Sequence, residues 1–317
     1  MTTTTEHPST ESRFKEAWRD PSLRLQRMLA MVLLICQGGI TVTGSLVRVT
    51  GSGLGCDTWP LCHEGSLVPV AGASPWIHQA IEFGNRTLTF VVAAAAVLVL
   101  LAVIRAGRSK IIRELAWTSL FGVVFQAIVG GISVLLDLRW WSVAVHFLPS
   151  MILVWVAAIL YMRIAESDDE LPTRRYPARA QTWTVIAAVA LCFVLVTGTM
   201  VTGSGPHSGD SGIGMEGRLQ LDTRVLAYVH AICMYLYLIS TLIVTVLLHR
   251  NGAPEDAKRT AWVLIALIVV QWAIGVIQFR MGVPRWTIPM HIGMSSTVVA
   301  FSAFLFAHGK RRLPTLV

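Results

Sequence analysis

Four histidines lie at or just inside the start of long apolar segments: His78, His146, His230 and His291. An ionisable side chain inside a membrane is costly and usually functional, although a lone histidine can also be a satisfied structural residue. His230 and His291 fall at similar depth on alternate segments of one group of four, where two imidazoles can face each other across a helical bundle. Imidazole pairs in bundle cores are typical axial ligands of haem iron, so we predict that His230 and His291 ligate a haem.

The first half of the chain does not repeat this pair. His146 is the counterpart of His291, but Asn85 is the counterpart of His230. His78 precedes Asn85 by seven residues, two helical turns or about 10 Å nearer the outside, so it cannot take the place of an imidazole at position 85. We therefore expect one axial histidine, His146, and a more open iron in the first half. His78 is a second ligand only if its helix begins elsewhere than expected.

Glu82 places a carboxylate one turn before Asn85, inside an apolar segment. Such a group is expensive to bury unless it is paired or used. One interpretation is an ion pair with Arg86, four residues further on. The other is a catalytic carboxylate that takes a proton or stabilises positive charge beside a reacting group. Ala227 is the equivalent residue in the second half, which suggests that one half reacts while the other carries electrons or supports the structure.

Membrane helices must position these residues. Apolar residues make up 54% of the chain and charged residues only 14%, whereas soluble domains average about 25% charged residues. Runs of about 20 or more apolar residues recur, long enough to cross a bilayer core of roughly 30 Å as helices. We predict an all-α integral membrane protein with eight spans. They cover approximately residues 25–47, 78–104, 111–135, 142–162, 181–202, 223–248, 260–280 and 288–308.

The eight spans form two matching sets of four. The matching stretches are FQAIVGGI (125–132) with VQWAIGVI (270–277), and VTGSLVRVTGSG (42–53) with VTGTMVTGSG (196–205). Gln126 precedes His146 by 20 residues, as Gln271 precedes His291. An even number of spans per set makes the repeats parallel, so we predict two pseudo-symmetric four-helix bundles in tandem. The predicted divisions are a flexible tail (1–24), a first bundle (25–163), a linker (164–180), a second bundle (181–309) and a tail (310–317).

Basic residues are distributed unevenly about these spans. The chain has 26 Lys and Arg against 18 Asp and Glu, a net charge of +8. We place 19 of the 26 on one side, in the termini and the loops of that side, six on the other, and Arg86 inside a span. This positive-inside bias predicts a multi-pass protein of the cell membrane with both termini cytoplasmic. The basic charge therefore reports topology and requires no nucleic-acid partner. Residues 1–24 are polar and lack the apolar core of a signal peptide.

Cysteine positions agree with this orientation. Cys56 and Cys62 lie in the outer loop, in CDTWPLC, where an oxidising compartment permits a disulfide. We predict that disulfide, with a reactive dithiol as the alternative. Cys36, Cys192 and Cys233 fall inside spans and are expected to be small buried apolar residues.

The segments TGSGLGCDTWPLC, IEFGNR, VHFLP, YVHA and MHIG, at these spacings over nearly the whole chain, resemble the haem A synthase family. The resemblance implies oxidation of the C8 methyl group of haem O to a formyl group, by successive hydroxylation and loss of water, to supply haem A to terminal oxidases. Glu82 matches the family's essential glutamate, and His146, His230 and His291 match three of its four haem histidines. Cys56 and Cys62 match its outer-loop cysteine pair, whereas Asn85 replaces the fourth histidine.

The resemblance further implies that the first half binds haem O as substrate and that the second binds haem B. A lipid-accessible pocket suits the farnesyl tail of haem O. Cations at the outer side would pair with the haem propionates; the candidates are Arg48, Arg139, Arg224 and Arg285. The implied partners are an electron donor that the sequence does not identify and an assembly with haem O synthase or the terminal oxidase.

Two other functions compete with this one. A di-haem b-type cytochrome that carries electrons without modifying haem explains the histidines, but it leaves Glu82 and the asymmetry of the halves unexplained. A transporter explains the duplication, but the chain shows neither the broken spans nor the midplane charges common in such proteins.

Overall fold

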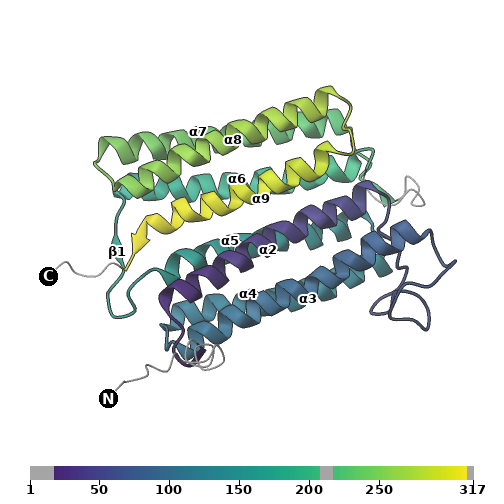
Figure 1. Cartoon of the computed structure of the whole chain (residues 1–317). Coiled ribbons are helices and arrows are strands. Elements are labelled where there is room, and N and C mark those ends of the chain that lie inside the picture. Colours follow the sequence, from purple (N-terminus) through teal and green to yellow (C-terminus); the bar gives the residue numbers. More distant parts are fainter. Residues whose placement is uncertain (1–17, 208–216, 313–317) are drawn as a thin grey trace, which may run out of the picture.

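The chain folds into a bundle of long helices, and a computed structural model describes its residues 18–207 and 217–312 (Figure 1). Eight helices in this part are long and apolar enough to cross a membrane, which confirms the predicted all-α membrane fold. They are α2 (Leu23–Val49), α3 (Trp76–Arg105), α4 (Lys110–Leu135), α5 (Trp140–Ile164), α6 (Ala178–Ser204), α7 (Thr223–Arg250), α8 (Glu255–Arg280) and α9 (Thr287–His308). Two short antiparallel strands pair with each other. They are β1 (Thr173–Arg174), between α5 and α6, and β2 (Lys310–Arg311), which follows α9.

Helix ends differ from the predicted spans where polar residues extend a helix beyond the apolar stretch. The clearest case is α8, which begins at Glu255 rather than near residue 260, with Glu255 and Asp256 in its first turn. Acidic residues favour a helix N-terminus through the helix dipole, although they count against a membrane span. Lys310 and Arg311, predicted to lie in a tail, form β2. Leu23 and Arg24, also predicted to lie in a tail, belong to α2, and residues 1–17 and 313–317 of the predicted tails lie outside the described residues.

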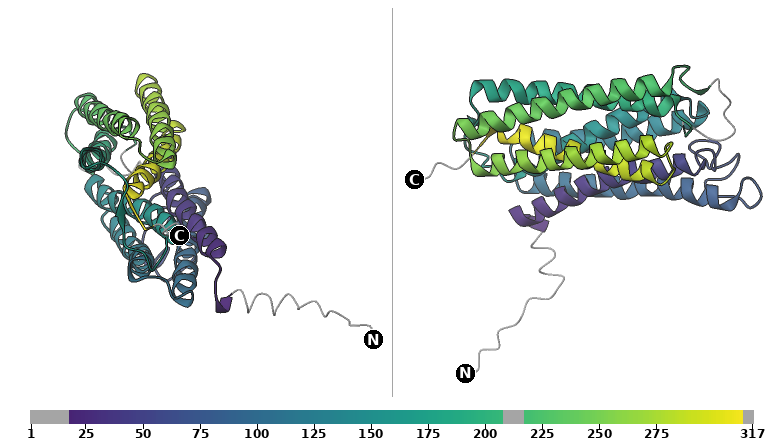
Figure 2. Two further views of the ribbon diagram at one scale, coloured as in Figure 1. Left: turned by 90° about the vertical axis from the view of Figure 1, so that its left-hand side faces the viewer. Right: turned by 90° about the horizontal axis from the view of Figure 1, so that it is seen from above.

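Within each set of four consecutive helices, every helix contacts two others of the same set. In the first set, α2 and α4 both contact α3 and α5; in the second, α6 and α8 both contact α7 and α9. The two sets meet through contacts of α5 with α9, of α2 with α9 and of α5 with α6 (Figures 1 and 2). These contacts are compatible with two pseudo-symmetric bundles. The division of the chain into halves at residues 164–180 stays a prediction.

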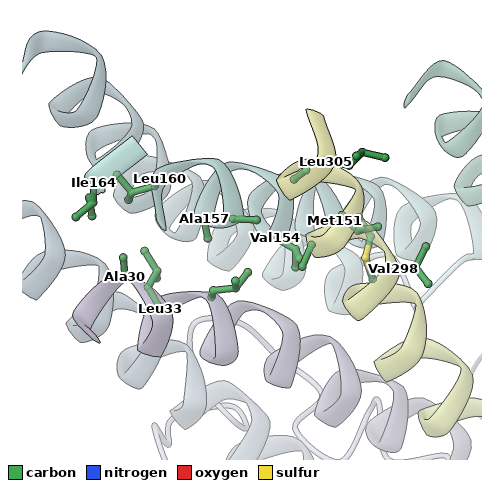
Figure 3. Packing of buried hydrophobic residues seen from close by; sticks show 14 of the residues in the cluster. Ala30, Leu33, Met151, Val154, Ala157, Leu160, Ile164, Val298 and Leu305 are labelled. Atoms are coloured by element: carbon green, nitrogen blue, oxygen red, sulfur yellow. The ribbon is translucent and has the colours of Figure 1, made fainter. Parts of the chain in front are cut away.

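The buried core includes residues of all eight helices, and α2, α5 and α9 meet within it. Figure 3 shows Ala30 and Leu33 of α2 opposite Leu160 and Ile164 of α5, and Val298 of α9 beside Met151 of α5. Small residues let membrane helices approach closely, which increases their van der Waals contact. Because α5 carries His146 and α9 carries His291, this core fixes the relative positions of two of the candidate haem ligands.

The long connection between α2 and α3 lies at the end of the bundle where α8 joins α9 (Figure 1). β1 and the described end of α9 lie at the opposite end. All of the candidate site residues lie in the half of the bundle nearer the long connection.

Candidate functional site

The predicted disulfide is present in the long connection. Cys56 and Cys62 are joined by an S–S bond of 2.04 Å, and both are fully or almost fully buried. Cys36, Cys192 and Cys233 are free thiols in helices, as predicted, but the expectation that they are buried was wrong: Cys192 is exposed and the other two are half-buried, because an apolar side chain in a membrane helix can also lie on its outer face. We refer to residues 56–62 below as the disulfide loop.

Glu82 is buried in α3 and is held by two partners. Its Oε1 accepts hydrogen bonds from Arg86, at 2.7 Å from Nη2 and 3.2 Å from Nε, and its Oε2 accepts the backbone N–H of Cys56 at 3.0 Å. The ion pair with Arg86 that the sequence allowed is therefore present. Both oxygens of the carboxylate are engaged, so a catalytic role must be compatible with these bonds.

Arg86 fastens the disulfide loop to α3. Its guanidinium donates to the carbonyl oxygens of Cys56 at 2.8 Å, Thr58 at 2.9 Å and Leu61 at 3.1 Å. Together with the two bonds to Glu82, these contacts use the planar array of donors that arginine provides. The carboxylate, the guanidinium and the loop backbone thus form one connected polar cluster.

Two further contacts attach the long connection to α3. His63 lies 2.9 Å from Asp57 through Nδ1 and 2.9 Å from Gln79 through Nε2. His78 lies in the first turn of α3, with Nδ1 2.8 Å from Ser52 Oγ. These contacts explain both histidines as supports of the connection. The helix begins close to its predicted start, so His78 lies two turns from Asn85 and is not brought to its level.

Trp59 carries the disulfide loop across to α4. Its indole ring lies directly over Gly131, where a Cβ atom would overlap the ring. The loop therefore bridges α3, which carries Glu82, and α4, which packs against the helix of His146. The sequence analysis missed this contact, because a glycine in a membrane helix more commonly marks ordinary close packing.

We expect Gly131→Ala to loosen the disulfide loop, because the added methyl group displaces Trp59. The disulfide is buried in the native protein, so its reduction by a water-soluble phosphine should become several-fold faster. The free thiols are blocked first, and newly exposed cysteines are then counted by mass. Gly84→Ala is the matched control, since no atom lies within 4 Å of a Cβ there. Equal reduction rates for the two variants would contradict the bridging role.

The three candidate haem histidines share a local environment. Each imidazole lies against a glycine of the preceding helix; the pairs are Gly130 with His146, Gly198 with His230 and Gly275 with His291. A Cβ atom on these glycines would lie 3.0, 3.2 and 3.3 Å from the Cε1 atom of the respective ring. The glycines therefore make room for imidazoles that turn into the bundle.

Gln126 orients His146. Its Oε1 lies 3.0 Å from His146 Nδ1, while its Nε2 donates to the His146 carbonyl at 3.0 Å and to Ser150 Oγ at 2.6 Å. The amide oxygen can only accept, so Nδ1 carries the proton and Nε2 keeps a lone pair. A partner that fixes the tautomer in this way is the usual support of a metal-binding histidine. The sequence showed the 20-residue spacing but gave no sign of this role.

Gln271 contacts His291 at the equivalent place in the second half. Its Nε2 lies 3.0 Å from His291 Nε2, and it also donates to Ser295 Oγ at 2.7 Å. Among the described residues, buried His291 Nδ1 and Gln271 Oε1 have no hydrogen-bond partner. A buried nitrogen without a partner in a native protein calls for an explanation such as an absent ion or ligand.

The residues fit a haem better than a metal ion bound by protein alone. In the described part of the chain, no three His, Cys, Asp or Glu side chains gather to hold a metal. Iron in a macrocycle needs only one or two protein ligands. Isolated imidazoles backed by glycines provide that number. The orphaned His291 nitrogen is consistent with the same assignment.

The four outer arginines divide into two groups. Arg48 is already engaged at the junction of the halves, donating to the carbonyl oxygens of Thr202 at 2.8 Å and His207 at 2.5 Å. Arg139, Arg224 and Arg285 are exposed, and their guanidinium groups have no partner among the described residues. These three are therefore the better candidates for haem propionates.

The sequence is similar to proteins that assemble cytochrome oxidase. Residues 27–208 match the model of the COX15-CtaA family, described as cytochrome oxidase assembly protein. The chain is 30% identical over 182 residues to the haem A synthase of Staphylococcus saprophyticus, covering 55% of this chain and 58% of that protein, little more than half its length. It is 26% identical over 266 residues to the haem A synthase of Bacillus licheniformis, covering 78% and 84% of the two chains. A Staphylococcus aureus haem A synthase is 27% identical over 276 residues, covering 79% and 85%.

Proposed function

We propose, since the chain belongs to the COX15-CtaA family of cytochrome oxidase assembly proteins, that it is a haem A synthase that oxidises the C8 methyl group of haem O to a formyl group. The observation that carries the proposal is the asymmetry of the two halves. The second half has two half-buried imidazoles, His230 and His291, suited to hold haem B. The first has one, His146, together with the buried carboxylate Glu82.

His146 and Gln126 would bind the substrate. With its proton held on Nδ1 by Gln126, His146 offers the Nε2 lone pair to the iron of haem O. A bound haem supplies the oxidising chemistry, while the protein supplies position and electrostatics. In the second half, Thr197 and Gln271 contact the two ligating imidazoles and hold them in place. We assign electron supply to that half.

Glu82 is our candidate catalytic residue. Arg86 donates twice to Oε1 and the Cys56 N–H donates once to Oε2, so Oε2 keeps one lone pair that could accept a proton. Protonation would weaken the ion pair with Arg86, whereas stabilising positive charge near the reacting methyl group leaves it intact. We therefore favour the electrostatic role, with the disulfide loop closing the outer side of the first half.

The proposed setting follows from the charge distribution. We infer that the protein lies in the cell membrane with both termini cytoplasmic, so that the disulfide loop faces the oxidising side. The proposed partners are haem O synthase, which would deliver the substrate, a terminal oxidase that receives the product, and an electron donor.

The decisive test is expression in a host that makes haem O but no haem A. Haem extracted from the purified protein should contain haem A or its alcohol intermediate, identified by mass. Protein that carries haem but leaves haem O unchanged would favour the di-haem b-type cytochrome. Protein without haem would contradict both functions.

Alanine variants should separate the two pockets. We expect His146→Ala to lose haem O while retaining haem B, and the double variant His230→Ala with His291→Ala to lose haem B while retaining haem O, because each removes every candidate imidazole ligand from one half only. The measurement is the ratio of the two haems extracted from each purified variant. Loss of both haems from either variant, with the helices intact by circular dichroism, would contradict separate pockets.

A further inference from the structure

Two equivalent threonines contact equivalent residues in the two halves. In α6, Thr197 Oγ1 lies 3.1 Å from His230 Nδ1, and in α2, Thr43 Oγ1 lies 2.7 Å from Asn85 Oδ1. Both threonines belong to the repeated sequence VTG. Asn85 therefore occupies the place of His230, with the same kind of hydroxyl group behind it.

The two hydroxyl groups have opposite roles. Thr197 donates its proton to the Phe193 carbonyl at 2.7 Å, so it accepts from His230 Nδ1 and leaves Nε2 with a lone pair. Thr43 Oγ1 also lies 3.1 Å from the Ile40 carbonyl, but its shorter contact, 2.7 Å, is to Asn85 Oδ1, an oxygen that can only accept, so Thr43 is the donor in that contact. The two N–H groups of Asn85 are therefore not used in this contact, and Nδ2 has no hydrogen-bond partner among the described residues.

This polarity makes Asn85 a poor iron ligand. An amide nitrogen has no lone pair available for a metal, and Thr43 occupies one of the two lone pairs of the amide oxygen. The asparagine is also shorter than an imidazole. A Cβ at Gly198 would touch the His230 ring, whereas no atom lies within 4 Å of a Cβ at Gly44, the matching glycine of the first half.

The other candidate ligands of the first half are engaged or too far away. Both carboxylate oxygens of Glu82 accept hydrogen bonds, and His78, held by Ser52 in the first turn of α3, lies two turns from Asn85. In the described part of the first half, His146 is therefore the one oriented imidazole that offers a lone pair to the pocket.

We propose that the first half binds haem O through His146 alone and that Asn85, oriented by Thr43, directs an N–H donor toward the opposite face of the porphyrin. The proposal rests on the function proposed above and deepens it. Asn85 is then a donor to a small ligand on that face, and Thr43 is the positioning residue that sets its polarity. The second half, with two imidazoles, has no such open face.

Carbon monoxide is the probe that tests this assignment on the full chain purified with both haems. Reduced haem with one histidine ligand binds carbon monoxide readily, whereas haem with two histidine ligands must first lose one of them. We expect the wild type to bind one carbon monoxide per two haems. Asn85→His should bind none and give a low-spin absorption spectrum for both haems. His230→Asn, the reciprocal swap, should bind carbon monoxide at both haems.

The stretching frequency of the bound carbon monoxide tests whether Asn85 donates a hydrogen bond to it. A hydrogen bond to the bound carbon monoxide lowers this frequency, so Asn85→Leu should raise it, and Thr43→Val should broaden or raise it by freeing the amide. Thr197→Val is the matched control and should leave the frequency unchanged. The proposal is overturned if the wild type binds no carbon monoxide, if Asn85→His binds it as the wild type does, or if Asn85→Leu leaves the frequency unchanged.

These readouts do not involve turnover, so the two proposals can fail separately. If haem A never forms but the carbon monoxide results are as expected, the proposed synthase function is wrong and the proposed ligation by His146 alone is supported. If haem A forms and Asn85→His changes neither the spectrum nor carbon monoxide binding, the ligation falls and the function stands.

Discussion

Glutamine in place of Glu82 should lower haem A formation by about 100-fold or more, the effect typical of losing a group that transfers protons or stabilises charge. The amide has nearly the same shape but no negative charge, and it can no longer accept from both Arg86 and Cys56. His146, His230 and His291 are unchanged, so both haems should remain bound. The measurement is the ratio of haem A to haem O extracted from a host that makes haem O.

Glu64→Gln is the control, because Glu64 is an exposed carboxylate in the same connection. It should form haem A at the wild-type level. Reduction of the disulfide in Glu82→Gln then separates two roles of the carboxylate. If haem A is lost while the disulfide stays protected, the charge acts on the reaction; if protection is lost as well, Glu82 acts by anchoring the loop. Wild-type formation of haem A by the variant would exclude both roles.

The helices were predictable because lipid imposes strong rules on sequence. Apolar length and the need to satisfy the backbone located all eight helices, and the largest error is at α8, where the polar turn Glu255–Asp256 extends the helix. The disulfide was predictable because two cysteines lie in one outer loop. In both cases the deciding information is local in the chain.

The polar cluster around Glu82 was predictable only in part. The spacing of Glu82 and Arg86 suggested their ion pair, since residues four apart are neighbours on a helix. The other partners of Arg86 are backbone carbonyls of the disulfide loop, and a carbonyl has no signature in the sequence. The contact of Trp59 with Gly131 likewise depends on how the loop crosses to α4.

The residues that orient the histidines could be seen in the sequence as repeats, but their role could not be predicted from it. Gln126, Gln271 and the VTG threonines appear in the sequence as repeated letters that mark a duplication. Their function depends on which atom each side chain presents to its neighbour. The halves share this supporting set, and the difference between them lies in Asn85 and Glu82. Duplication thus preserved the pocket while substitution changed what the pocket can bind.

Methionine in place of Arg86 should destabilise the protein more than any other single change near the loop. Removing one partner of a buried ion pair leaves an uncompensated charge, which typically costs about 3–5 kcal/mol. Here the change also leaves the carbonyls of Cys56, Thr58 and Leu61 without their donor. We expect a clear fall in the thermal unfolding temperature of the detergent-solubilised protein and rapid reduction of the disulfide.

The double variant Glu82→Gln with Arg86→Met identifies the cause. If the stranded carboxylate dominates, the double variant should be more stable than Arg86→Met alone, because the buried charge is gone. If the lost carbonyl contacts dominate, the double variant should be no more stable than the single one. Arg113→Met is the matched control, since Arg113 is exposed and its guanidinium has no partner in the described part of the chain. If Arg113→Met lost as much stability as Arg86→Met, the proposed contribution of the Arg86 contacts to stability would be contradicted.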